Sequence, residues 1–194
     1  RVEIEGNCKT LQFAATELRR CLDLLPDQKG NGCIRLSVVC DSDTHPYDDA
    51  ISIDVTAGAG TITGPNPRSV LIGVYRYLQE LGCQFLFPGK TGEVFPQTIC
   101  LPGSKVKIED RPRNRYRGIC IEGSNRVETL LDVIDFLPKL GFNCYFTQFQ
   151  QSHTFFKWWY RHTRHPELED STPYPIEEAE KNLSRVVEEI TKRD

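Results

Sequence analysis

The sequence predicts an α+β fold, in which a small sheet with helices on one face is followed by a second part that begins with alternating strands and helices. Three observations lead to this prediction. Helical and strand periodicities alternate over residues 10–87, prolines and glycines interrupt residues 90–114, and a strand–helix–strand–helix order follows. We expect a domain boundary near residue 112, which divides the chain into residues 1–111 and 112–194.

The first elements follow from the spacing of apolar residues. Residues 10–25 carry apolar side chains at helical spacing up to Pro26, which predicts an amphipathic helix. Residues 33–40 and 50–56 alternate apolar and polar side chains, which is the period of a half-buried strand. Residues 58–64 are predicted to return from the second of these strands as a hairpin.

A turn rich in proline introduces the second helix. Residues 64–68, with the sequence GPNPR, form the turn, and the apolar residues of 70–81 recur on one helical face. Gly82 is expected to end this helix. Residues 83–87 are apolar except for Gln84 and are followed by Pro-Gly, which predicts a short strand.

The second part of the chain has the order that is typical of a parallel sheet or barrel. The periodicities predict a strand over residues 116–122, a helix over 127–140, a strand over 143–149 and a helix over 176–193. Two strands alone leave their edges unpaired. We therefore expect them to pair with the first part of the chain or to self-associate with another copy of it.

The composition excludes several classes of function. The 194 residues include 24 Lys and Arg against 27 Asp and Glu, and the formal net charge of −3 gives no reason to expect nucleic-acid binding. No apolar stretch approaches the roughly 18–20 residues of a membrane helix, and the first residues lack the apolar core of a signal peptide. We expect a soluble, cytoplasmic protein with no membrane partner.

The cysteines and histidines do not predict a metal site. None of the eight cysteines stands in a CxxC pair, the spacing that zinc ribbons and fingers use. Most of them lie in apolar surroundings, which favours buried, reduced thiols, although disulfides stay open for an exported protein. His153, His162 and His165 have no acidic or cysteine partner at ligand spacing. The sequence predicts neither a metal nor a cofactor.

Four segments, taken in order, resemble one group of enzymes. They are ITGPNPRSVLIGVYRYL (62–78), LGCQFLFP (81–88), RYRGICIE (115–122) and GFNCYF (141–146). This order resembles the N-terminal region of α-glucuronidases and β-N-acetylhexosaminidases, which are glycoside hydrolases with a small α+β domain before a (β/α)8 catalytic barrel. The resemblance implies a hexosaminidase domain 2-like sandwich followed by the first βα units of an incomplete (β/α)8 barrel.

The length of the second part limits what it can do. A (β/α)8 barrel needs roughly 250 residues, whereas residues 115–194 suffice for about two βα units. The resemblance implies that the catalytic carboxylates lie on later barrel strands, so no catalytic residue is assigned within this chain. We expect the N-terminal portion of a glycoside hydrolase that is inactive alone.

Candidate substrate-binding residues follow the two strands of the second part. Glu122 and Arg126 come after the first strand, where the resemblance implies an acidic residue and a substrate-binding arginine, and their spacing departs from that pattern by one residue. Gln148 and Gln150 close the second strand, and amides at the end of a barrel strand suit sugar hydroxyls. The alternative to sugar binding is a capping or loop charge for Glu122 and a solvated loop edge for Gln148 and Gln150.

The most aromatic stretch of the chain, residues 153–162, contains one more candidate. Trp158 is a candidate platform for the face of a sugar ring. Phe155, Trp158 and Trp159 also fall at helical spacings, so core packing of a short helix is the alternative.

Two functions therefore follow from the sequence. The first is the N-terminal part of a glycoside hydrolase that acts on O-glycosyl bonds, with a carbohydrate as its ligand. The alternative is a stand-alone carbohydrate-binding or interaction module.

Overall fold

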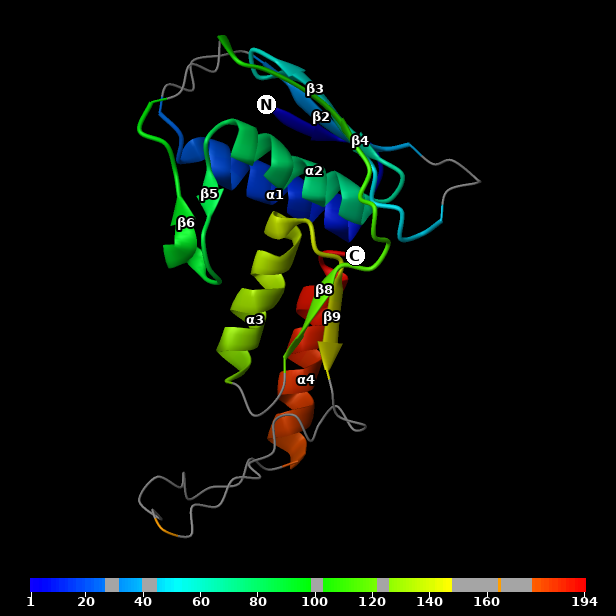
Figure 1. Cartoon of the computed structure of the whole chain (residues 1–194), viewed down its shortest axis with the longest axis vertical. Helices are drawn as coiled ribbons and strands as arrows, with labels where there is room; N and C mark the ends of the chain where they lie inside the picture. The colour runs from blue at the N-terminus through cyan, green and yellow to red at the C-terminus, as the bar shows by residue number, and fades with distance from the viewer. Residues whose placement is uncertain (27–31, 40–44, 99–102, 122–125, 148–163, 165–175) are drawn as a thin grey trace.

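The computed structural model describes residues 1–26, 32–39, 45–98, 103–121, 126–147, 164 and 176–194 (Figure 1). The first part of the chain contributes two helices and most of the strands. Their bounds are β1 Val2–Ile4, α1 Lys9–Asp23, β2 Ile34–Val38, β3 Ile51–Thr56, β4 Ala59–Gly64, α2 Pro67–Glu80, β5 Gln84–Phe85, the 3-10 helix η1 Lys90–Gly92, β6 Glu93–Val94 and β7 Lys105–Asp110.

Five of these strands form one mixed sheet in the order β1-β2-β4-β3-β7. The β1–β2 and β2–β4 pairs are parallel, whereas β3 runs antiparallel to both β4 and β7. Helices α1 and α2 lie together on one face of this sheet (Figure 1). The predicted layer of helices on one face of a small sheet is confirmed.

The main core lies between the two helices and the sheet. Helix α1 buries its apolar stripe, and α2 is buried on nearly every side because it packs against β4, β3 and α1 at once. A side chain at Gly73 would stand 2.9 Å from Ile62 Cγ2, so this glycine allows α2 to lie close to the sheet. The largest fully buried side chains here are Leu11, Leu18, Ile34, Leu36, Ile53, Ile62, Leu71, Tyr75, Tyr77 and Leu78.

The predicted turn before α2 is a helix cap. Asn66 accepts a hydrogen bond from the Ser69 backbone N–H at 2.8 Å, and the Asn66 N–H donates to Ser69 Oγ at 3.1 Å. Pro67 occupies the first turn, where no backbone donor is needed. At the other end, Gly82 has φ = +94°, the left-handed conformation that ends a helix. Both ends of α2 are therefore set by residues next to it in the chain.

The second part contains a separate parallel pair of strands with helices packed against it. Strands β8 Gly118–Ile121 and β9 Cys144–Thr147 are connected through α3 Val127–Phe136 and the 3-10 helix η3 Leu137–Leu140, and the chain ends after α4 Ile176–Thr191. Pro138 explains why the predicted helix over 127–140 changes form at residue 137, since proline cannot donate the next α-helical hydrogen bond. A second core joins these elements through Val127, Leu130, Ile134, Ala179 and Val186.

Strands β8 and β9 pair with each other and not with the five-stranded sheet, as far as the described residues extend. Within the described residues, no strand of the first part of the chain pairs with β8 or β9. The expectation that these strands pair with the first part is therefore wrong for the described residues. The first part contributes a strand to its own sheet instead: β7, within the Pro- and Gly-rich stretch, pairs with β3 from Ile51↔Asp110 to Thr56↔Lys105.

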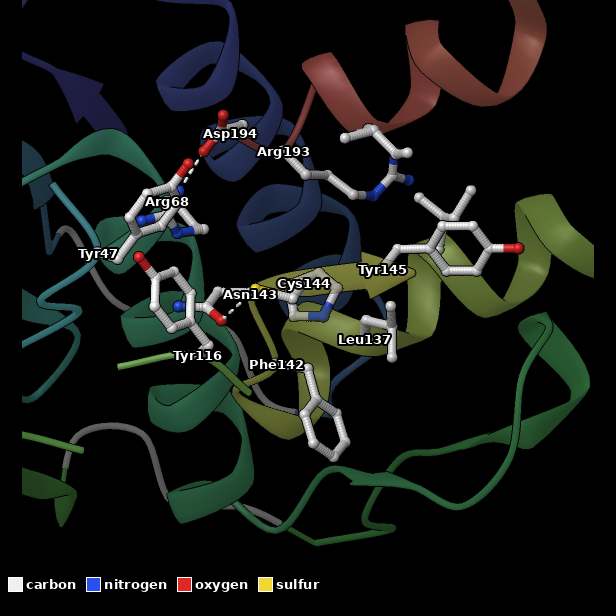
Figure 2. Close-up of a pocket in the computed structure, with 13 residues that line it drawn as sticks. Tyr47, Arg68, Tyr116, Leu137, Phe142, Asn143, Cys144, Tyr145, Arg193 and Asp194 are labelled. Carbon is white, nitrogen blue, oxygen red and sulfur yellow. Dashed lines mark hydrogen bonds and ion pairs between the residues drawn. The ribbon is translucent and has the colours of Figure 1, made fainter. Parts of the chain in front are cut away.

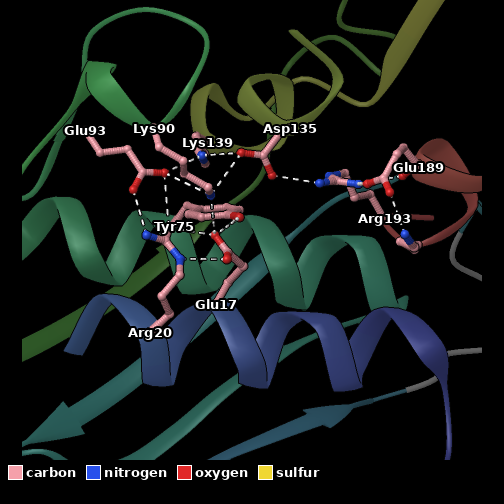
Figure 3. Close-up of polar contacts among 10 residues, drawn as sticks. Glu17, Arg20, Tyr75, Lys90, Glu93, Asp135, Lys139, Glu189 and Arg193 are labelled. Atoms are coloured by element: carbon pink, nitrogen blue, oxygen red, sulfur yellow. Dashed lines mark hydrogen bonds and ion pairs between the residues drawn. The ribbon is translucent and has the colours of Figure 1, made fainter. Parts of the chain in front are cut away.

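A network of ion pairs joins the two parts (Figure 3). Lys139 is 2% exposed and donates to Glu93 Oε1 and to Asp135 Oδ2, both at 2.7 Å. Arg20 from α1 binds the same Glu93 carboxylate at 2.8 Å, and Arg193 binds Asp135 Oδ1 at 2.7 Å. The network thus connects α1 and β6 of the first part with α3, η3 and the end of the chain.

The acidic members of the network have lowered pKa values. Burial alone raises the pKa of Asp135, but the charge of Lys139 and the hydrogen bonds from Lys139 and Arg193 outweigh it and hold this pKa well below its usual range. Burial likewise raises the pKa of Glu93, and hydrogen bonds from Arg20 and Lys139 lower it further than burial raises it. Both groups are therefore more acidic in the folded chain than in the unfolded chain.

These lowered pKa values predict that acid weakens the fold. A carboxyl with a depressed folded-state pKa stabilises the folded chain fully above its unfolded-state pKa, and this contribution is lost as the pH falls toward the folded-state value. We expect the free energy of unfolding, measured by urea titration, to fall between about pH 5 and about pH 3. A free energy of unfolding that rises or stays constant over this range would contradict the prediction.

Two buried cysteines are unreactive by environment. Burial raises the pKa of Cys21 to about 12 and that of Cys83 to about 11. Their thiols stay protonated at neutral pH and act as small apolar side chains in the core, which agrees with the sequence prediction.

In the described part of the chain, every helix is too short or too polar to cross a lipid bilayer.

Candidate functional site

The carboxyl ends of β8 and β9 meet at one edge of the second part. The strands are parallel, with Gly118 opposite Cys144 and Ile121 opposite Thr147. Ile121 and Tyr145 pack against the core formed with α3 and α4, which fixes the face of the pair. The next residues in the sequence are Glu122 after β8 and Gln148 after β9. Both strands therefore lead into candidate sugar-binding residues at the same edge.

Arg126 is the one predicted site residue within the described ranges. It lies immediately before α3 as its N-cap residue, it is exposed, and its side chain makes no capping hydrogen bond. It also forms no ion pair with the residues that the structure describes. The guanidinium is thus available to solvent at the start of α3. Glu122, Gln148, Gln150 and Trp158 lie outside the described residues, so their roles stay predictions.

A pocket of about 290 Å³ lies at the opposite, amino end of β9, between the two parts of the chain (Figure 2). Tyr47 and Arg68 line it from the first part, and Tyr116 with residues 142–145 line it from the second. Figure 2 shows these groups around one hollow together with the end of the chain. The remaining lining residues are Ile134, Leu137, Pro138, Ile190, Arg193 and Asp194.

Tyrosines and an arginine form one wall of this pocket. The ring centroids of Tyr47 and Tyr116 are 5.2 Å apart and the rings are tilted by 51°. The guanidinium carbon of Arg68 lies 5.0 Å from the centroid of the Tyr47 ring, a cation–π contact. Tyr116 is 62% exposed. This wall therefore offers an aromatic surface to the solvent.

Asp49 organises the polar groups behind the pocket. Its carboxylate is fully buried and accepts hydrogen bonds from Arg68 Nε at 3.1 Å, from Arg117 at 2.8 Å and from Asn143 Nδ2 at 2.6 Å. Asn143 Oδ1 in turn accepts the backbone N–H of Arg117 at 2.9 Å. A single carboxylate of the first part thus holds the amino ends of both β8 and β9.

The cations at the pocket are already neutralised. Arg68 pairs with Asp49 and Asp194, and Arg193 pairs with Asp135 and Glu189. Burial lowers the pKa of Arg193, but its hydrogen bonds to Asp135 and Glu189 raise this pKa above its usual value, so the guanidinium stays charged and paired. The pocket therefore has no unpaired cation among the groups described here.

Sequence reasoning does not identify the residues of this pocket. The patterns place Tyr116 and Asn143 only at the starts of strands, and they place Asp49 and Arg68 only at a strand boundary and in a turn. Their partners lie far away in sequence, since Asp49 contacts both Arg117 and Asn143. One sequence feature could have pointed to these pocket residues. Charged residues, among them Asp48, Asp49 and Arg68, lie directly beside apolar strands and helices.

The described residues include no group of three or more His, Cys, Asp or Glu side chains placed to hold a metal ion. His153, His162 and His165 lie outside the described ranges.

Comparisons with known proteins bear on the fold. No protein-family model matches the chain, and no curated protein matches its sequence. Solved structures do match: the chitobiase FjGH20 of Flavobacterium johnsoniae superposes with a TM-score of 0.62 at 20% identity. A GH138 enzyme that targets the pectin rhamnogalacturonan II superposes with a TM-score of 0.64 at 16% identity.

The chain shares its fold with parts of these two glycoside hydrolases. Each match covers the whole of this chain but only 30% of the chitobiase and 24% of the GH138 enzyme, so the chain spans less than a third of either protein. The predicted similarity to glycoside hydrolases is confirmed at the level of fold. The beginning of a barrel and the particular enzyme family stay predictions.

Proposed function

We propose that this chain is a part of a glycoside hydrolase acting on O-glycosyl bonds, and that the carboxyl edge of β8 and β9 forms one wall of its substrate cleft. The observation that carries the proposal is the parallel β8–β9 pair, whose two carboxyl ends meet at one edge, with the exposed Arg126 following β8. In (β/α)8 enzymes the substrate binds at the carboxyl ends of the strands. The fold shared with two glycoside hydrolases supports the same assignment.

Arg126 is poorly explained by helix stability. The N-cap position favours Ser, Thr, Asp or Asn, because their side chains accept a hydrogen bond from the first turn, and arginine has no acceptor. A cation at this end also opposes the helix dipole. Arg126 therefore costs α3 some stability, and binding of a sugar hydroxyl or a uronate carboxylate is the role we assign to it.

We propose a substrate like those of α-glucuronidases or β-N-acetylhexosaminidases, in which Glu122, Gln148 and Gln150 add hydrogen bonds and Trp158 adds an aromatic face. General acid and base chemistry would come from carboxylates beyond this chain. The chain alone is then a binding wall and an accessory domain, without turnover.

The Arg126→Ser substitution tests the proposed role of this arginine. We expect serine to stabilise the fold by about 0.5–1 kcal/mol, because it caps α3 and removes a cation from the helix N-terminus. We expect the binding of glucuronate or N-acetylglucosamine at this edge, followed by NMR chemical shifts of Ile121 and Thr147, to weaken by about tenfold. Gained stability with lost binding distinguishes a binding role from a structural one.

Arg113→Ser is the matched control, since Arg113 is also exposed and precedes β8. It should change neither binding nor stability. Unchanged sugar binding in Arg126→Ser would show that Arg126 is not part of the binding site.

An assay of hydrolysis by the 194-residue chain, with aryl glucuronides and aryl N-acetylhexosaminides as substrates, completes the test. Robust hydrolysis by the chain alone would overturn the proposal that its catalytic carboxylates lie elsewhere.

A further inference from the structure

The pocket at the amino end of β9 is separate from the proposed substrate edge. It is lined by residues 142–145, at the start of β9, whereas the proposed edge lies after Thr147, at the end of the strand. It also takes Tyr47 and Arg68 from the first part of the chain, which the edge does not use. Pockets at the boundary between two structural units are frequent ligand sites. The pocket is therefore a candidate ligand site distinct from this edge.

The size of the pocket limits its ligand to a small ring. Sites for drug-sized ligands begin at about 300 Å³, and this pocket has about 290 Å³. Ile134, Leu137 and Ile190 contribute apolar lining, and Tyr47 and Tyr116 contribute adjacent aromatic rings. A ligand that fits has one apolar face and a polar rim.

The polar groups of the pocket decide the charge of the ligand. Arg68 and Arg193 are each paired with two carboxylates, so neither has charge left for an anion. Tyr47 is 36% exposed and Tyr116 is 62% exposed, so their rings and hydroxyls are accessible to a ligand. The available groups therefore suit a neutral ligand with hydroxyls.

We propose that this pocket is a second carbohydrate site, which binds a single neutral pyranose against the Tyr116 ring. The C–H face of a pyranose packs on an aromatic ring, and its hydroxyls are both donors and acceptors for tyrosine, arginine and carboxylate groups. The pocket does not share residues with the proposed substrate edge, so this inference stands or fails independently of the proposed function.

The test is an NMR titration of the 194-residue chain with methyl β-glucopyranoside, N-acetylglucosamine and, as the anionic comparison, glucuronate. We expect saturable shifts of Tyr116, Asn143 and Cys144 with the neutral sugars and weaker binding of glucuronate. In Tyr116→Ala, neutral-sugar affinity should fall about tenfold, whereas Tyr116→Phe, which keeps the ring, should stay within about threefold of the parent chain.

Phe87→Ala is the matched control, because Phe87 is 49% exposed and does not line the pocket. It should leave neutral-sugar binding unchanged. Arg126→Ser should also leave these shifts unchanged, which separates the pocket from the edge. Absence of saturable neutral-sugar shifts at Tyr116, Asn143 and Cys144, or undiminished affinity in Tyr116→Ala, would overturn the proposal. Tighter binding of glucuronate than of the neutral sugars, measured at these same three residues, would also overturn it.

Discussion

Replacement of Asp49 by alanine is expected to lower the free energy of unfolding by about 3–5 kcal/mol. The Asp49 side chain is completely buried and accepts hydrogen bonds from Arg68, Arg117 and Asn143. Alanine would remove the carboxylate that the largely buried Arg117 contacts and would leave Arg68 with Asp194 alone. A buried charge that loses its partner costs far more than an exposed one. Urea unfolding followed by circular dichroism measures the change.

Asp54→Ala is the control for this substitution. Asp54 also belongs to the first part of the chain, but its side chain is 56% exposed and its ion pair with Lys107 spans 3.7 Å. An exposed pair contributes about 1 kcal/mol at most, so Asp54→Ala should be nearly neutral. If the two substitutions had equal effects, Asp49 would not be the organising group that its contacts indicate.

The second large effect is expected for Lys139→Met. The ammonium group lies between the Glu93 and Asp135 carboxylates, and the side chain also lies over the rings of Tyr75 and Phe85. Methionine keeps the length and the apolar stem but removes the charge, which leaves two buried carboxylates with fewer cationic partners. We expect a loss of about 3 kcal/mol in the free energy of unfolding at neutral pH.

The pH dependence provides an independent check on Lys139→Met. Lys139 lowers the pKa of both Glu93 and Asp135, so its removal should bring these values back toward the usual range. The variant should then lose less stability than the parent chain between about pH 5 and about pH 3, and the two stability curves should converge. Parallel curves would show that Lys139 acts by packing alone. Lys107→Met, at an exposed lysine, is the matched control.

Local features of the fold were predictable from the sequence. Helix α1 and strands β2 to β4 closely follow the predicted ranges, since each buries one face and so carries the periodicity of its element. Helix α2 was predictable for a second reason, because Asn66 and Gly82 mark its two ends. These signals lie within a few residues of the structure that they specify.

Features that depend on distant partners were not predictable. Strand β7 alternates Val106 and Ile108 with charged residues, but it lies in a stretch interrupted by prolines and glycines for which no strand is predicted. Its pairing with β3 makes it a strand. The burial of Lys139 likewise depends on Glu93, 46 residues away in sequence. The pocket is harder still to predict, because the contact between Tyr47 and Tyr116 joins the two parts of the chain and depends on the tertiary structure.

The attachment of β8 and β9 at one end has a consequence for how this architecture changes over evolution. Asp49 secures the amino ends through Arg117 and Asn143, whereas Arg126 and the other proposed sugar-binding residues follow the opposite ends. Mutations that alter recognition therefore fall on positions that the anchoring does not require. A library randomised at residues 122–126 and 148–150 should retain folded members at high frequency, so new specificities can be sampled without rebuilding the protein.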